Sequence, residues 1–184
     1  AMGTIRAAGR AGMRHVRVLL ASKAWIARRD GLTLASQIAP TDLGRTLVAG
    51  LADKNWAVRV HAASLATALS GSKRREVEPA LKALLKDKFS AARLAAYKTL
   101  VAWDPHGAYI SAALNDPDAE VSYWAAQKYM RRGRAAKLTP EAKGKLIDSI
   151  IAKLRSGRWQ QIENLAIATL LTLGPEAHDA LYYP

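Results

Sequence analysis

Residues that could carry out catalysis are few in this sequence and are widely scattered. The chain has no cysteine, so it offers neither a thiolate nucleophile nor a thiolate metal site. The four histidines lie far apart, without the spacing of metal ligands: His15, His61, His106 and His178. No glycine-rich phosphate loop and no G-x-S-x-G nucleophile motif is present. We therefore expect a protein that is not an enzyme and that has no cofactor, no metal and no small-molecule substrate.

The charged residues that do recur are an aspartate and an arginine six residues later. Asp53 precedes Arg59, and Asp87 precedes Arg93. Around the first pair the sequence follows the pattern D-x-x-W-x-V-R-x-x-A, and about two further helical turns of Ala and Leu come after it. The same form appears in residues 87–96 and 116–125, in residues 22–31 with Ser in place of Asp, and more loosely in residues 156–162.

The spacing of these copies predicts how the chain is built. Corresponding positions are 31, 34, 29 and 40 residues apart and are occupied by Trp25, Trp56, Ser90, Ala119 and Trp159. A step of this length accommodates one helix, a short turn and a second helix. One such pair cannot bury its apolar face alone, so neighbouring pairs stack and share a core. The sequence thus predicts an all-α protein, a right-handed α-solenoid of about five helical hairpins.

Helix boundaries follow from apolar periodicity, prolines and capping residues. We expect Asp53 to cap the helix that begins at Trp56, and Gly71 to end it in the left-handed conformation. No segment alternates with period two, so we expect no strands. The predicted helices are residues 4–22, 25–38, 43–52, 56–69, 72–86, 90–103, 106–114, 120–130, 140–154 and 159–173, with residues 176–183 as a terminal cap or a further helix.

Net charge and its distribution indicate the class of partner. The chain carries 28 Lys and Arg against 15 Asp and Glu, a net charge of +13. Seven basic residues and no acid precede Asp30, and ten basic residues lie between Lys128 and Arg158. This charge suits nucleic acid, an acidic protein surface or an anionic membrane surface. No apolar run approaches the roughly 18 residues that a membrane helix needs.

The sequence also suggests a domain division. Residues 1–12 look like a cloning remnant followed by a frayed basic helix start, and residues 13–184 are predicted to form a single repeat domain. The arginine stripe at the beginning also resembles a transit peptide. Because Met13 to Ile38 already fits a helical pair, we prefer the helical interpretation and expect a cytoplasmic protein.

The repeated motif resembles the HEAT-repeat family, in the short form also seen in phycobilisome lyases. That family has an Asp in the turn, then Val-Arg, then Ala, and residues 53–62 match fully. The copy at Asp87 lacks the Val, and the copy at Asp116 lacks the Arg. The resemblance covers about Met13 to Leu173 and implies a fold rather than a function. It also implies a structural ladder between adjacent repeats, formed by Asp53, Arg59, Asp87 and Arg93.

Exposed basic and aromatic residues are the candidates for partner binding. Trp25, Trp56 and Trp159 share one repeat position, and they line one long edge unless they pack under the neighbouring repeat. Lys98 and Lys128 lie on second helices, which line the concave face in this architecture. The full set of candidates is Arg6, Arg10, Arg14, Arg17, Trp25, Trp56, Lys98, Lys128, Arg131, Arg132, Arg158 and Trp159.

Four functional hypotheses follow. The first is a non-catalytic scaffold that binds an acidic protein surface. The second is a nucleic-acid binder, which requires the two basic ends on one continuous surface. The third is a tubulin-binding module similar to TOG domains, which present side chains from successive turns. The fourth is similar to HEAT-like DNA alkylpurine glycosylases in its W-x-x-R spacing, but the sequence lacks their Trp-Asp-x-x-Asp stretch. Nothing marks a tetrapyrrole pocket, and the oligomeric state stays open.

Overall fold

The computed structural model describes residues 10–38, 42–104, 107–132, 140–155 and 163–182 of this chain. Every regular element within these ranges is an α-helix, and none is a strand. The chain divides into two compact units, residues 1–100 and residues 101–184. The protein is therefore all-α in the part that the structure describes, as the periodicity predicts.

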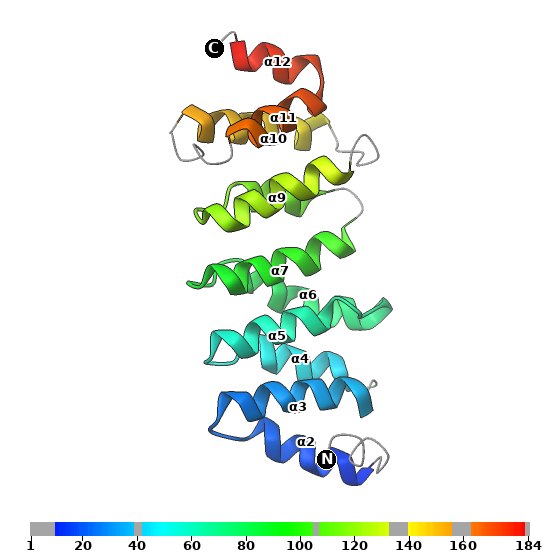
Figure 1. Cartoon of the computed structure of the whole chain (residues 1–184). Helices are drawn as coiled ribbons and strands as arrows, with labels where there is room; N and C mark the ends of the chain where they lie inside the picture. Colours follow the sequence, from blue (N-terminus) through cyan, green and yellow to red (C-terminus); the bar gives the residue numbers. More distant parts are fainter. Residues whose placement is uncertain (1–9, 39–41, 105–106, 133–139, 156–162, 183–184) are drawn as a thin grey trace. The chain divides into compact units, whose positions relative to one another are not determined.

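The first unit consists of helices that follow one another in pairs joined by short turns. Within each pair the two helices are antiparallel, and α2 packs on α3 as α4 packs on α5. First helices of successive pairs also pack together, α4 on α6, and so do second helices, α3 on α5 (Figure 1). These contacts are those of a helical repeat. The pairs are α2 (Arg10–Leu20) and α3 (Trp25–Ile38), and α4 (Leu43–Leu51) and α5 (Trp56–Ala66). They are followed by α6 (Gly71–Leu84) and α7 (Ser90–Trp103), and the last three residues of α7 belong to the second unit.

Leucines and alanines fill most of the core of the first unit. Leucines such as Leu32, Leu47 and Leu81 are at most 1% exposed and fill the space between helices. The second helices also bury alanines, among them Ala62 and Ala96 with no exposed surface. Small side chains let helices approach closely, and Thr99 of α7 accordingly reaches across to donate a hydrogen bond to the Ala63 carbonyl of α5 at 2.7 Å.

The second unit also consists of packed helix pairs, and its helices vary more in length. The first helix α8 packs on α9, and α10 then packs on α8 while α11 packs on α9. The last helix, α12, packs on both α10 and α11. The core contains Ile110, Leu114, Val121, Ile150 and Leu170, all with no exposed surface. The helices are α8 (Ala108–Leu114), α9 (Ala119–Arg132), α10 (Pro140–Arg155), α11 (Glu163–Leu173) and α12 (Pro175–Tyr182).

Two predicted helix boundaries were wrong. Gly71 does not end α5, which stops at Ala66; it has φ of +56° and begins α6 instead. Asp53 does not cap α5, because Asn55 occupies the N-cap position and its side chain accepts a hydrogen bond from the Ala57 backbone N–H. The predicted helix starts before residue 10 and between residues 156 and 162 lie outside the described residues.

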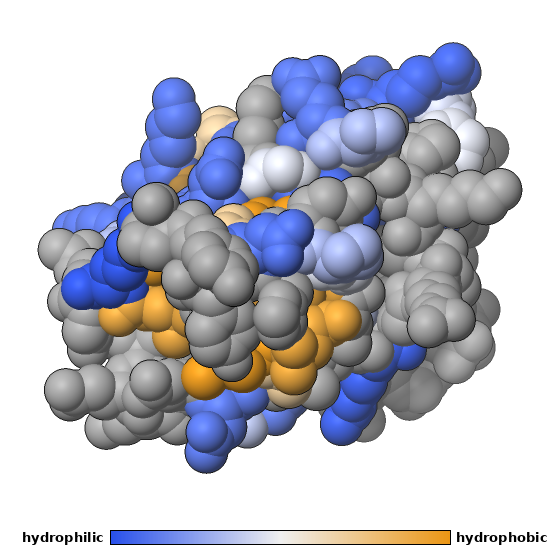
Figure 2. Space-filling model, turned by 90° about the horizontal axis from the view of Figure 1, so that it is seen from above, coloured by the Kyte–Doolittle hydropathy of each residue, from blue (hydrophilic) through white to orange (hydrophobic). Residues whose placement is uncertain are grey.

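One face of the molecule carries both apolar and polar residues (Figure 2). Figure 2 views the molecule from above, and hydrophobic residues gather in the middle of that face with hydrophilic side chains around them. None of the described helices combines the length and the apolar character that crossing a membrane requires.

Candidate binding surface at the turns

The turns that enter the second helices share one local structure, which the repeated motif encodes. In each turn a side-chain oxygen accepts a hydrogen bond from the backbone N–H two residues later. Asp53 accepts from Asn55 at 2.8 Å, and Asp87 accepts from Phe89 at 2.9 Å. Ser22 does the same for Ala24 at 3.2 Å, which explains how Ser substitutes for Asp in the first copy. In the second unit, Asp116 accepts from Asp118 at 2.9 Å.

An arginine then holds each turn of the first unit from the second helix. It stands six residues after the turn residue, and its Nη1 donates to that residue's own backbone carbonyl. The three bonds run from Arg28 to Ser22 at 2.9 Å, from Arg59 to Asp53 at 2.8 Å, and from Arg93 to Asp87 at 2.8 Å. The six-residue interval in the sequence is therefore the interval over which the guanidinium folds back onto its turn.

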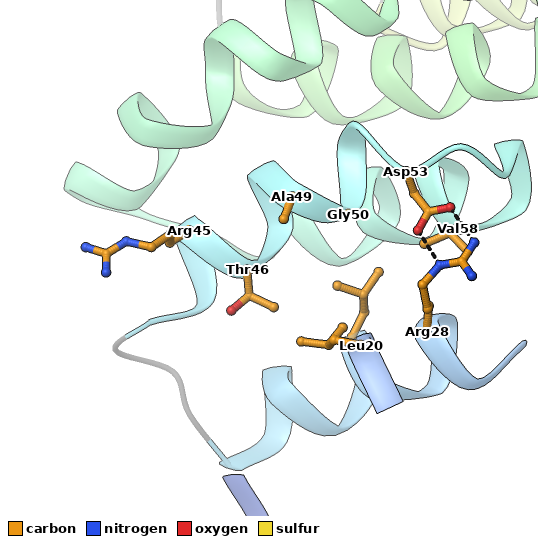
Figure 3. Close-up of a pocket in the computed structure, with 9 residues that line it drawn as sticks. Leu20, Arg28, Arg45, Thr46, Ala49, Gly50, Asp53 and Val58 are labelled. Carbon is orange, nitrogen blue, oxygen red and sulfur yellow. Dashed lines mark hydrogen bonds and ion pairs between the residues drawn. The ribbon is translucent and has the colours of Figure 1, made fainter. Parts of the chain in front are cut away.

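Two of these arginines also reach the next turn along the chain. Arg28 donates from Nε and Nη2 to the two carboxylate oxygens of Asp53, at 2.6 and 2.8 Å (Figure 3). Arg59 makes the same bidentate contact with Asp87, at 2.6 and 2.8 Å. Because each guanidinium binds one turn by its carbonyl and the next by its carboxylate, the three turns lie side by side along one edge of the first unit (Figure 1).

Hydrogen bonds within these ion pairs shift the pKa values of Arg28, Asp53 and Asp87. The hydrogen bond from Arg28 holds the pKa of Asp53 below its ordinary value, and the same bond raises the pKa of Arg28. Burial alone would raise the pKa of Asp87, but the hydrogen bonds from Arg59 and from the Phe89 N–H outweigh it, and the pKa of Asp87 is lowered. Both carboxylates are therefore charged at neutral pH and are neutralised by their arginines.

The turn of the second unit departs from this pattern at one residue. Ser122 stands six residues after Asp116, where the three copies of the first unit have arginine. Its hydroxyl donates to the Asp116 carbonyl at 2.9 Å, so it preserves the contact within the turn. A serine side chain is too short to extend to a further carboxylate as Arg28 and Arg59 do. The Arg that is missing from the copy at Asp116 thus has a local replacement.

Lysines follow the turn residues, and none of them forms a salt bridge with a described residue. Lys23, Lys54 and Lys88 each come directly after the residue that forms the turn, and all three are exposed. The carboxylates of the same turns, Asp53 and Asp87, are already occupied by arginine. The lysine charges therefore dominate the field at this edge.

Aromatic rings stand between these lysines. Trp25, Trp56 and Phe89 are 37%, 42% and 39% exposed. Trp56 stacks on Phe89 of the next turn, with 6.0 Å between ring centroids and 29° between planes. The sequence leaves open whether the tryptophans are exposed along an edge or packed against the neighbouring repeat. For Trp56 both descriptions hold, since its indole packs on the neighbouring turn and still faces solvent. The name turn edge is used below for Lys23, Trp25, Lys54, Trp56, Lys88 and Phe89.

Cations also cover some ring faces on the turn edge. The Arg29 guanidinium lies 5.7 Å from the centroid of Trp25, and the Lys88 amine lies 5.2 Å from the centroid of Phe89. Arg59 lies 5.9 Å from the same Phe89 ring. Such contacts hold the rings in place at an exposed site.

The other predicted binding residues are distributed over both units. Arg14 and Arg17 are exposed on α2, and Lys98 is exposed on α7. In the second unit, Lys128 and Arg131 are exposed on α9. The remaining candidates lie outside the described residues or have side chains that do: Arg6, Arg10, Arg132, Arg158 and Trp159.

Sequence reasoning missed several members of this site although signals were present. Arg28 belongs to the ion-pair series, and its distance of six residues from Ser22 matches that of Arg59 from Asp53. The lysines were also detectable, because one follows the turn residue in each of the first three copies. Phe89 was passed over because its copy is aligned on Ser90, and only the fold brings its ring to Trp56.

The second helices carry a separate polar contact. The Thr33 hydroxyl of α3 and Nε2 of His61 in α5 lie 2.6 Å apart. Burial is the main cause of a lowered pKa at His61, and the positive charge of Arg29 adds to it. His61 therefore contacts a neighbouring helix.

A pocket of about 300 Å³ lies beside the first ion pair (Figure 3). Three of its polar side chains are engaged within the chain, since Asp53 binds Arg28 and the Thr46 hydroxyl donates to the Asp42 carbonyl at 3.1 Å. The nine described residues that line it include no aromatic side chain: Leu20, Arg28, Leu32, Arg45, Thr46, Ala49, Gly50, Asp53 and Val58. This lining differs from the aromatic cleft with a carboxylate that the glycosylase hypothesis requires.

Comparisons with protein-family models, with curated proteins and with solved structures found no match for this chain. The repeat and its turn edge are thus defined by the contacts within the chain itself.

Proposed function

We propose that this chain is a non-catalytic scaffold of HEAT-like repeats that binds an acidic protein partner through its turn edge. The helical pairs continue, in this proposal, as a right-handed α-solenoid of about five hairpins. The observation that carries the proposal is the placement of three exposed lysines at one repeat position, between exposed aromatic rings, where the neighbouring carboxylates are already neutralised.

The chemistry of the turn edge favours a partner that supplies both carboxylates and apolar groups. An amine on a flexible stem is a point charge that pairs with single carboxylates without demanding planar geometry. Aromatic residues are enriched at the centres of protein interfaces, where they contribute a large contact area. The ion pairs behind them fix the turns, so the surface is preorganised and loses little entropy on binding.

The aromatic contact argues against nucleic acid as the preferred partner of this surface. Proteins that bind single strands stack bases on exposed rings. A base inserted between two rings needs about 7 Å between them, twice the roughly 3.4 Å stacking distance of bases. The centroids of Trp56 and Phe89 are 6.0 Å apart, and the two rings already stack on each other.

The test is a binding titration with poly-L-glutamate, followed by calorimetry at two salt concentrations. The edge variant carries Lys23→Glu, Lys54→Glu and Lys88→Glu. The control variant carries Arg45→Glu, Arg75→Glu and Arg155→Glu, which make the same charge change at exposed positions on α4, α6 and α10. We expect the edge variant alone to lose binding, and binding to weaken as salt rises.

Two results would contradict the proposal. If both variants lose affinity equally, the net charge of the chain and not the turn edge accounts for binding. If single-stranded oligothymidylate binds more tightly than poly-L-glutamate and depends on the same lysines, nucleic acid is the partner class.

A further inference from the structure

We infer that the segment recognised by the turn edge is an acidic polyproline II helix that presents a carboxylate at every third residue. This inference rests on the proposed function and adds the conformation and the periodicity of the partner. It depends on the regular placement of the lysines, one per helical pair, and on the rings that separate them.

The first step concerns the distance between the lysines. Arg28 and Arg59 tie the three turns together, so the turns repeat at the spacing of packed helices. Packed helices lie about 8–10 Å apart. Lys23, Lys54 and Lys88 occupy the same place in each turn and therefore project at intervals of about 8–10 Å.

The second step compares this interval with the periodicities of an extended peptide. A polyproline II helix has 3 residues per turn and rises about 3.1 Å per residue, so residues i, i+3 and i+6 lie on one face about 9 Å apart. A β-strand reaches a similar distance in three residues, but its side chains alternate between faces, so every second carboxylate would point away. Of these two extended conformations, polyproline II is the one that places carboxylates three residues apart opposite successive lysines.

The third step concerns the aromatic rings. Proline-rich segments dock in the polyproline II conformation on surfaces lined by aromatic side chains. The half-exposed rings of Trp25, Trp56 and Phe89 provide such surfaces between the lysines. A repeating Glu-Pro-Pro segment fits both features, because each turn offers one carboxylate to a lysine and proline rings to an aromatic face.

The experiment compares two synthetic peptides of identical composition and charge by titration calorimetry. One repeats Glu-Pro-Pro four times, and the other places the four glutamates together before the eight prolines. We expect the repeating peptide to bind about tenfold more tightly, since the block isomer loses about two lysine contacts of surface strength. The edge variant should abolish this preference, and the control variant should keep it.

The outcomes separate this inference from the proposed function. Equal affinity for the two peptides, lost in the edge variant, would overturn the periodicity and leave the acidic-partner proposal standing. Binding of both peptides that the edge variant does not change would overturn the inference and the proposed function together. Circular dichroism and the thermal unfolding midpoint of both variants, which alter only exposed side chains, verify that each variant is folded.

Discussion

Arg59 donates one hydrogen bond to each carboxylate oxygen of Asp87, and a third to the backbone carbonyl of Asp53. A single side chain on α5 therefore joins the turn before its own helix to the turn before α7. Arg28 makes the equivalent contacts one repeat earlier. The repeated charges of this sequence thus align the surface that carries the lysines, and they do not themselves face a partner.

The ion pair predicts a large loss of stability when one member is removed. The side chains of Arg59 and Asp87 are only 11% and 9% exposed, so Arg59→Met leaves the carboxylate buried and unpaired. We expect the free energy of unfolding to fall by about 3 kcal/mol. Urea denaturation measures it, with Arg75→Met at an exposed site of α6 as the control. A loss equal to that of the control would show that the pair does not hold the turns.

The depressed pKa values of Asp53 and Asp87 predict a loss of stability in acid. Their carboxyl groups bind protons more weakly in the folded chain than in the unfolded one. The stabilisation is therefore complete above the unfolded value of about 4, and is lost as the pH falls from there through the lower folded values. Urea midpoints from about pH 7 to about pH 3 measure this, and Asp87→Asn should flatten the profile. An unchanged slope in the variant would contradict the assignment.

His61 predicts a separate and milder pH effect. Its pKa is lowered chiefly by burial and further by Arg29, while Asp30 opposes the shift. The unfolded chain therefore takes up the proton first, and stability falls as the pH drops below about 6.5 toward the folded pKa. His61→Gln should remove this step while the acid loss from the aspartates remains. NMR titration of the imidazole measures the folded pKa directly, and a value at or above the ordinary one would contradict the prediction.

The N-cap residues of α4 and α5 can be compared directly, because only one of them makes a side-chain capping hydrogen bond. Asn55 accepts a hydrogen bond from the Ala57 N–H at 2.9 Å, whereas Asp42 at the N-cap of α4 makes no side-chain capping bond. We expect Asn55→Ala to cost about 1 kcal/mol of unfolding free energy and Asp42→Ala to cost clearly less. Thermal and urea unfolding of the two variants measure the difference. Equal losses would mean that the Asn55 side chain does not satisfy the helix end.

Most of the helices could be predicted from the sequence, whereas few of the contacts at the candidate site could. Apolar periodicity, with the prolines that follow, locates α3 and α7 with the bounds that the structure has. The turn residues also follow from the motif, because an Asp or Ser side chain that binds the backbone two residues later acts locally. Contacts between repeats are harder to predict, since they depend on register across the packed helices. The stacking of Trp56 on Phe89 and the contact between Thr33 and His61 are of this kind.

Substitution of glycine by alanine is expected to have opposite effects on stability at two helical positions, Gly50 and Gly144. A Cβ at Gly50 in α4 would lie 2.9 Å from a methyl group of Leu32 and 3.0 Å from the Cβ of Ala62, so α4 could no longer approach α3 and α5 as closely. We expect Gly50→Ala to destabilise the chain by about 1–3 kcal/mol.

Gly144 in α10 is the matched control, because a Cβ there meets no atom within 4 Å. Alanine is the better helix former, so Gly144→Ala should stabilise the chain by up to about 1 kcal/mol. Urea denaturation of both variants gives the two free energies. If Gly50→Ala is also stabilising, helix propensity outweighs packing at that position, and the close approach of α4 to the second helices is not what selects glycine there.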